Sequence, residues 1–307
     1  MRIIFFGTPD FAVATLASLL NHQMNVVAVV TAPDKPSGRG QQLTTSAVKD
    51  FALERGLAVL QPINMKDHSF VRELESYQAD IQIVVAFRMM PEIVWMMPRF
   101  GTMNLHGSLL PQYRGAAPIN WAIINGEIKT GVTTFLLKHE IDTGNILLQE
   151  EVEIQPNDDF GSMYEKLKQV GAELVVETLR LLALNKLTPI SQESIQQEKL
   201  MHAPKLTKEL GKINLENEVV YNCNLIRGLS PFPTAYFEFL DSNQKSQSIK
   251  IFKARMEKAE HTERGIVTDG KSFLKLACRG GYIVVEDLQL QGKKRMATAD
   301  FLRGFRF

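Results

Sequence analysis

Two polar side chains that could do chemistry, Asn104 and His106, stand two residues apart at the end of a short apolar run. The run, Gly101–Leu105, has the composition of a strand, and side chains at i and i+2 of a strand point to the same face. We therefore expect Asn104 and His106 to face one space at the end of the strand. An amide donor beside a titratable ring suits acyl transfer, in which an oxyanion develops and a proton moves. The turn that follows contains Pro111 and Gly115, as expected where backbone is held against a ligand.

A carboxylate, Asp142, is the third candidate for this chemistry, and it lies in the segment Glu140–Gly144. A carboxylate in such a turn often bonds only the neighbouring backbone. Paired with His106, it would fix the tautomer and orientation of the imidazole or help to relay a proton. His139 is close to Asp142 in the sequence and is the rival to His106. The residues alone leave both interpretations of Asp142 open, and they leave open a purely structural role for Asn104 and His106.

A long polar loop, Ala32–Thr45, carries the cations Lys35 and Arg39 among several prolines and glycines. A loop of this length in a compact domain is usually functional or disordered, and cationic loop tips suit contact with phosphates. An idle surface loop is the alternative. Another turn, Gly7–Phe11, follows the first apolar run, but it has one glycine and lacks the dinucleotide fingerprint G-x-G-x-x-G.

The elements that must position these residues alternate between strand-like and helix-like stretches in the first half of the chain. Strands alternating with helices predict βαβ units and a mostly parallel sheet, whose ligands bind beyond the carboxyl ends of the strands. Asn104 and His106 lie at such an end. The expected strands are Arg2–Phe6, Val26–Thr31, Ile81–Ala86, Gly101–Leu105, Gly131–Leu137 and Asn145–Ile154, and the expected helices are Ala12–Leu20, Ser46–Arg55 and Phe160–Leu184.

The second half has a different pattern. From Thr188 to about Thr207, polar residues and two prolines predict a linker. A helix is expected at Asn217–Ile226, and short strands with polar turns then predict a small antiparallel barrel or sandwich. These strands are expected at Ala235–Leu240, Ser248–Ala254, Gly265–Val267, Phe273–Ala277 and Tyr282–Gln289.

Charge also divides the chain. Residues 205–307 carry 18 Lys and Arg against 12 Asp and Glu, whereas residues 1–204 carry 17 against 22. A basic second half is typical of a protein that faces a polyanion, although a well-solvated basic surface gives the same count. Charge alone does not distinguish RNA from DNA.

Other features exclude several classes of protein. No apolar run approaches the roughly 20 residues that span a bilayer, and the N-terminal apolar run is too short for a signal peptide. The two cysteines, Cys223 and Cys278, are far apart and form neither a disulfide framework nor a metal motif. We expect a cytoplasmic protein without a metal, in which both cysteines are buried as small hydrophobic residues.

Taken together, the motifs resemble those of the folate-dependent formyltransferases, and the resemblance spans nearly the whole chain. Asn104-Leu105-His106 followed by Ser108-Leu109-Leu110-Pro111 is the strongest mark of that superfamily. The start Gly7–Ala12, the Gly38-Arg39-Gly40 loop and the basic second half resemble the members that act on tRNA. The further matching segments are Pro33–Gly40, Arg114–Ile119, Asp142–Gly144 and Ser230–Pro233.

The resemblance implies an α/β fold and a reaction. Residues 1–188 would form a doubly wound, Rossmann-like catalytic domain, 189–206 a linker, and 207–307 a small OB-like β-barrel that binds tRNA. The implied reaction transfers a formyl group from 10-formyltetrahydrofolate to the amino group of methionine on initiator tRNA. An amine attacks only when it is neutral, so a proton must be lost. We expect a monomer that does not associate with membranes.

By the same resemblance, Asn104 would hold the formyl oxygen and stabilise the tetrahedral oxyanion. His106 would stabilise that intermediate and take part in proton transfer, and Asp142 would orient His106 and help move the proton to the folate nitrogen. The tRNA acceptor end would meet Lys35 and Arg39. The folate site would be lined by Ser108, Leu109, Leu110 and Pro111, with Phe87 and Met89 in its wall.

The chain departs from the family pattern in a few places. Arg88 stands where many relatives have glycine, which bears on the wall of the folate site. Gln41 and Gln42 stand where relatives often carry lysine, so the loop is less basic here. Phe232 replaces a common tryptophan.

Two alternative functions share some of these features. A formyltransferase for a small amine, such as glycinamide ribonucleotide or an amino sugar nucleotide, would use the same Asn104, His106 and Asp142 but would not need a basic second domain. A non-catalytic RNA-binding protein on the same scaffold would not need the three side chains at all. Their joint presence favours an enzyme.

Overall fold

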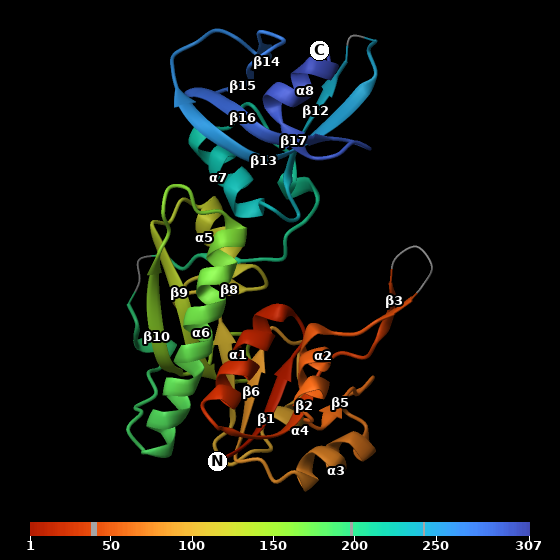
Figure 1. The fold of residues 1–307 in the computed structure, drawn as a ribbon. Coiled ribbons are helices and arrows are strands. Elements are labelled where there is room, and N and C mark those ends of the chain that lie inside the picture. Colours follow the sequence, from red (N-terminus) through yellow and green to blue (C-terminus); the bar gives the residue numbers. More distant parts are fainter. Residues whose placement is uncertain (38–41, 197–198, 242) are drawn as a thin grey trace. The chain divides into compact units, whose positions relative to one another are not determined.

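The computed structural model describes residues 1–37, 42–196, 199–241 and 243–307, and its ribbon is shown in Figure 1. The chain forms two compact units that interleave in the sequence. The first comprises Met1–Gly115, Thr130–Val152 and Tyr164–His202, and the second comprises Ala116–Lys129, Glu153–Met163 and Ala203–Phe307. The division into domains at 188 and 207 stays a prediction.

The first unit is built on a seven-stranded sheet in the order β10-β9-β7-β6-β1-β2-β5. The five strands from β5 to β7 run parallel, and β9 is antiparallel to β7. The α/β fold expected from the alternation is therefore confirmed. The sheet strands are β1 (Arg2–Gly7), β2 (Asn25–Val30), β5 (Val59–Leu60), β6 (Ile81–Val85), β7 (Thr102–His106), β9 (Lys129–Leu136) and β10 (Ile146–Glu153).

Helices follow the strands along the chain. Ser46 is the N-cap of α2 and accepts a hydrogen bond from the backbone N–H of Lys49, which satisfies a donor that the first turn leaves free. The helices with most of their residues in this unit are α1 (Asp10–Asn21), α2 (Ala47–Glu54), α3 (His68–Ser76), α4 (Glu92–Trp95) and α6 (Phe160–Ala183). The short elements are β3 (Lys35–Ser37), β4 (Gln42–Thr44), β8 (Arg114–Gly115), η1 (Gln192–Ser194) and β11 (His202–Ala203).

The core of the first unit explains why β1 and β6 lie at the middle of the sheet. Residues 3–6 of β1 are fully buried, as expected for a parallel strand covered on both faces. On one face, Ile4 and Phe6 pack with Phe70 and Leu74 of α3 and with Val94 of α4. This packing fixes the sheet, so that the carboxyl ends of β6 and β7 are held in register with each other.

The second unit contains a six-stranded antiparallel sheet that curls around its own core, and its order is β12-β13-β16-β15-β14 with β17 on β16. The pairing of β13 with β16 shifts register after Ile251 and after Lys253, and such bulges bend a sheet. Its elements are α5 (Pro118–Ile124), η2 (Glu209–Gly211), α7 (Val219–Leu229), β12 (Ala235–Leu240), β13 (Ser246–Lys258), β14 (Gly265–Thr268), β15 (Leu274–Cys278), β16 (Gly281–Leu290), β17 (Met296–Ala297) and α8 (Thr298–Gly304).

The core of this unit joins segments that are distant in the sequence. Ile124 of α5 packs with Ile226 of α7 and with the apolar side chains of the curled sheet. Asn120 of α5 donates a hydrogen bond to the carbonyl of Gly228 over 2.7 Å. The described residues contain no helix with the length and apolar character needed to cross a membrane.

Candidate active site

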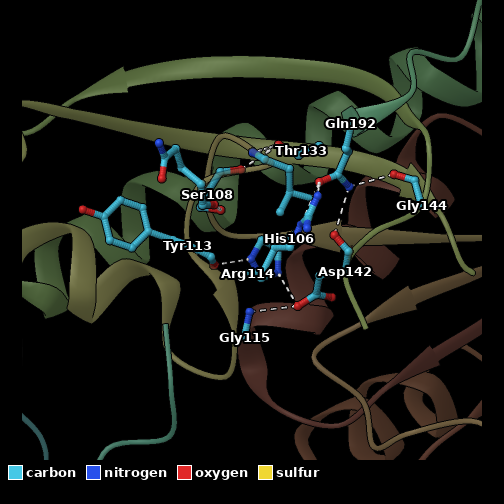
Figure 2. A network of polar contacts seen from close by, with 11 residues as sticks. His106, Ser108, Tyr113, Arg114, Gly115, Thr133, Asp142, Gly144 and Gln192 are labelled. Atoms are coloured by element: carbon cyan, nitrogen blue, oxygen red, sulfur yellow. Dashed lines mark hydrogen bonds and ion pairs between the residues drawn. The ribbon is translucent and has the colours of Figure 1, made fainter. Parts of the chain in front are cut away.

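His106 is the last residue of β7 and is buried, with 6% of its surface exposed. Its Nε2 lies 2.9 Å from the carbonyl oxygen of Tyr113. A carbonyl can only accept, so Nε2 carries the proton and Nδ1 keeps a lone pair when the ring is neutral. Figure 2 shows the ring held between the Tyr113 carbonyl and the turn that carries Asp142.

Asp142 faces the other nitrogen of this ring. Its Oδ2 lies 3.9 Å from Nδ1 of His106, and only 13% of its side chain is exposed. This separation is longer than a hydrogen bond, so the carboxylate and the neutral ring are neighbours that are not bonded. A proton on Nδ1 would turn them into an ion pair. The structure therefore brings together His106 and Asp142, 36 positions apart in the sequence, whereas no contact joins the rival His139 to Asp142 among the described residues.

The turn around Asp142 is strongly constrained. Asp142 has a left-handed backbone with φ of 57°, a conformation that aspartate tolerates better than most residues. The backbone N–H of Gly115 donates to its Oδ2 over 3.0 Å. A Cβ on Gly144 would lie 1.5 Å from the carbonyl oxygen of Leu136, so no larger residue fits there without movement of the turn.

Asn104 lies on the same strand as His106 and is half-buried. It is in register with Val84 of β6 and Phe135 of β9, between the two strands that flank β7. Within the described part of the chain its side-chain amide has no hydrogen-bond partner. A half-buried amide without a partner is able to donate to a ligand, because it has no competing bond inside the protein.

The turn after β7 carries the residues predicted to line a folate site. Ser108 is buried and donates to the carbonyl of Gln112 over 2.6 Å, and Leu110 packs with Phe135 and Ile146. Pro111 is also buried, and Leu109 is half-buried beside Gly131, where a Cβ would come within 2.5 Å of it. The turn is therefore held from several sides.

Phe87 and Met89 follow the carboxyl end of β6. Phe87 is half-buried and packs edge-on against Phe6, with ring centres 5.6 Å apart, whereas Met89 is 76% exposed. Arg88 bonds the carbonyls of Pro62 and Ile63 and lies over the Phe87 ring. The residue that departs from the family pattern thus ties this segment to the loop after β5.

The predicted phosphate-contact residues lie in the loop around the β3–β4 hairpin. Lys35 is exposed at the start of β3, and Arg39 lies outside the described residues. The preceding residue, Asp34, accepts hydrogen bonds from Lys49 over 2.5 Å and from Gln61, and these bonds lower the pKa of its carboxyl. They fix the base of the loop on α2.

Three residues that the sequence interpretation missed complete the site. Thr133 of β9, in register with His106, donates to the carbonyl of Ser108 and accepts from the backbone N–H of Leu110. Gln149 of β10 donates to Thr133 and to the carbonyl of Leu110. Gln192 donates to the carbonyls of Asp142 and Gly144. Thr133 and Gln149 lie in two of the expected strands, and this position could have indicated them. No motif marks Gln192.

The carboxyl of Asp10, in the Gly7–Ala12 segment, belongs to a separate polar cluster in the first unit. Tyr164 of α6 donates to it over 2.6 Å and accepts from the backbone N–H of Phe11. Burial, followed by the charge and hydrogen bond of Asp10, raises the pKa of Tyr164. The cluster joins the start of α1 to α6, so Asp10 has a structural role.

Comparisons with known proteins match the chain to one family in two segments. The family described as formyl transferase matches residues 1–179, and its C-terminal domain matches residues 205–306. The methionyl-tRNA formyltransferase of Parabacteroides distasonis is 49% identical over 311 residues, which cover 100% of this chain and 96% of that protein.

Two solved structures share the fold at lower identity. The N-formyltransferase of Helicobacter canadensis, in complex with folinic acid and dTDP-3-aminofucose, has a TM-score of 0.68 and 18% identity, and the match covers 96% of this chain and 100% of that one. HypX of Aquifex aeolicus, in complex with tetrahydrofolic acid, has a TM-score of 0.64 and 18% identity, and the match covers 98% of this chain and 47% of that one. With both family domains present and a relative 49% identical along its whole length, the chain belongs to the methionyl-tRNA formyltransferase family.

Proposed function

We propose that the chain transfers the formyl group of 10-formyltetrahydrofolate to the α-amino group of methionine on initiator tRNA and so supports translation initiation. Its methionyl-tRNA formyltransferase relatives carry that activity in their name, and this chain covers nearly their full length. The observation that carries the proposal is the juxtaposition of His106 and Asp142 at the end of β7, two residues beyond an amide without an internal partner.

Asn104 would bind the formyl oxygen. The half-buried amide is able to donate a hydrogen bond, and a donor aimed at a carbonyl oxygen stabilises the negative charge that develops when an amine attacks. Its side chain leaves β7 on the same face as that of His106. The two groups therefore suit one reacting centre.

His106 and Asp142 would handle the proton that the amine loses. The bond from Nε2 to the Tyr113 carbonyl leaves Nδ1 as the basic nitrogen of the neutral ring. A proton taken up at Nδ1 would lie beside the Asp142 carboxylate, which stabilises the imidazolium. The pair could then return this proton to the nitrogen of the departing folate.

The folate would bind beside the turn of Ser108, Leu109, Leu110 and Pro111, with Phe87 and Met89 in the wall of its site. The exposed side chain of Met89 and the half-buried ring of Phe87 offer apolar surface to a pterin or benzoyl ring. HypX, which shares the fold, was solved with tetrahydrofolic acid. The folate is a substrate here, and the proposed chemistry uses no metal.

The tRNA would be bound by cations from both units. Lys35 and Arg39 would contact the acceptor end from the loop of the first unit. The second unit contains a groove of about 920 Å³ lined by Lys205, Lys208 and Lys250 together with Phe232 and Tyr236. Lysines with interleaved aromatic rings suit phosphates and unpaired bases. We expect the protein to act as a monomer in the cytoplasm.

An assay of formyl transfer with parallel acceptors tests the proposal. The wild-type protein and 10-formyltetrahydrofolate are mixed with methionyl-initiator tRNA, free methionine, glycinamide ribonucleotide or an amino sugar nucleotide. Transfer to the charged tRNA alone is the expected result. Transfer to a small amine alone would be consistent with the roles proposed for Asn104, His106 and Asp142. It would refute methionyl-initiator tRNA as the acceptor.

Salt-sensitive tRNA binding without any transfer would instead favour the non-catalytic alternative. The sugar-directed alternative is represented by the Helicobacter canadensis structure, but at 18% identity that likeness shows the fold alone.

A further inference from the structure

Gln192 occupies a place that its sequence context does not predict. It begins η1 in the stretch whose composition predicts a linker, yet it is 3% exposed. The segment is anchored just before it, because Ile190 and Ile146 of β10 exchange two backbone hydrogen bonds of 2.8 Å. This anchoring places the side chain of Gln192 beside the turn that follows β9.

The orientation of the Gln192 amide is fixed by its partners. Arg114 donates from Nε and Nη2 to the amide oxygen, over 3.0 and 2.6 Å. A guanidinium has only donors, so the atom that it meets must be the oxygen. The amide nitrogen is then directed at two carbonyl oxygens, those of Asp142 at 2.9 Å and Gly144 at 2.7 Å. Figure 2 shows this chain of contacts from Arg114 to the turn.

These two bonds hold the part of the turn that the backbone itself disfavours. Asp142 has a left-handed φ of 57°, and such a conformation persists where surrounding contacts over-determine it. Gln192 holds its carbonyl while Gly115 holds its carboxylate. The distance of 3.9 Å between Asp142 and Nδ1 of His106 therefore depends on a residue 50 positions away.

We infer that Gln192, with its orientation fixed by Arg114, is a positioning residue that sets Asp142 against His106 for proton transfer. The inference rests on the proposed function, since it assigns the purpose of that geometry to formyl transfer. Gln192 itself touches no reacting atom in this role. Its effect on turnover must therefore pass through Asp142.

The test is a double-mutant cycle with the isosteric variant Gln192→Glu. This change keeps the oxygen that Arg114 bonds but replaces the NH2 donor by an oxygen that faces two carbonyls. We expect kcat to fall by about 10-fold or more, because a displacement of about 1 Å can cost as much as about 10²-fold in rate. The KM values for folate and tRNA should change by less than about 2-fold.

In the Asp142→Asn background, Gln192→Glu should change kcat by less than about 2-fold, since the group it positions is already lost. The melting temperature should fall by a similar amount in both backgrounds. Gln82→Ala is the matched control: Gln82 is a buried glutamine that accepts a hydrogen bond from Thr102 at the start of β7. It should lower stability without changing kcat.

Equal losses of kcat in both backgrounds would overturn the inference, as would wild-type kcat in Gln192→Glu. Crystal structures of the two proteins decide the matter without turnover. The carboxylate of Asp142 should move away from His106 in the variant, and an unmoved carboxylate contradicts the role. Absence of transfer by the wild-type protein would refute the proposed function and leave this structural comparison to decide the positioning.

Discussion

At the scale of single residues, the site combines two groups that are held and one that is not. His106 is fixed by the Tyr113 carbonyl, and Asp142 is fixed by the backbone N–H of Gly115. The amide of Asn104 has no partner within the described part of the chain. This arrangement suits the oxyanion donor proposed for Asn104, because its hydrogen bond would be made only with the substrate.

Asn104→Ala should lower kcat by roughly 10²–10³-fold, which is typical for loss of one oxyanion donor. Stability should hardly change, because the amide makes no internal bond that the variant would break. Steady-state formylation and thermal melting measure the two effects. Asn25→Ala, at the exposed start of β2, is the control. A variant with wild-type turnover would refute the oxyanion role.

How much of the site could be predicted depends on distance along the chain. The spacing of Asn104 and His106 predicts one shared face, because a strand places i and i+2 on the same side, and both residues do lie on β7. The residues alone left the role of Asp142 open, since nothing local says that its turn meets β7. Gln192 could not be predicted: its polar surroundings predict a linker, and its burial depends on the bridge between Ile190 and Ile146.

At the scale of elements, the turn between β9 and β10 determines where Asp142 lies. Gly144 lies so close to the carbonyl of Leu136 that a Cβ there must displace backbone. Gly144→Ala should therefore destabilise the protein by about 1–3 kcal/mol and also reduce kcat, because the same turn carries Asp142. Denaturant unfolding and formylation measure both.

Gly304→Ala provides the comparison for this variant. A Cβ at Gly304 meets nothing within 4 Å, so stability and turnover should stay at wild-type values. Wild-type stability and turnover in Gly144→Ala would contradict the prediction, because they would mean that the turn accommodates a Cβ at this position.

The packing of α7 on the curled sheet gives a prediction about pH. Burial raises the pKa of Cys223 to about 12 and that of Cys278 to about 11, from an ordinary value of 9.0. Between pH 9 and pH 11 the thiols of the unfolded chain lose their protons, whereas those of the folded protein keep them. The free energy of unfolding should therefore decline as the pH rises above 9 toward 11.

Denaturant unfolding across that pH range measures the decline, and the double variant Cys223→Ala/Cys278→Ala should show a shallower slope. A slope that is unchanged in the double variant would assign the effect to other groups. In the native protein, a thiol reagent should react with neither cysteine at pH 8, because both are buried and protonated.

The elements themselves were largely predictable where apolar periodicity is strong. All eleven strands expected from the sequence occur, since β-branched runs between polar turns have few alternatives. The sequence pattern does not predict α3, whose residues are mostly polar and which buries Phe70 and Leu74. It does not predict α5 either, because Pro118–Ile124 is a short, almost wholly apolar run without a periodic face.

At the scale of the whole molecule, the two compact units do not correspond to two consecutive stretches of the sequence. The segment with α5 belongs to the same unit as α7 and the curled sheet, and Ile124 is part of that core. Removal of residues 207–307 would therefore expose the apolar face of α5. Charge variants test the basic second unit more cleanly than a deletion.

The triple variant Lys205→Gln/Lys208→Gln/Lys250→Gln should weaken tRNA binding and lower its salt dependence, by about one unit of slope for each lysine that contacts a phosphate. Folate binding should stay unchanged. The matched control replaces Lys66, Lys186 and Lys271 by glutamine, three lysines that do not line the groove. Equal weakening of tRNA binding in both variants would mean that net charge, and not the groove, determines the affinity.

The proposed proton transfer is tested by the single-turnover rate of formyl transfer to methionyl-initiator tRNA, with both substrates saturating, for the wild-type protein and Asp142→Asn. We expect rapid transfer by the wild type and a rate lower by at least about 10²-fold in the variant, with substrate binding unchanged. Equal rates would contradict the claim that Asp142 and His106 together move the proton that this reaction must lose.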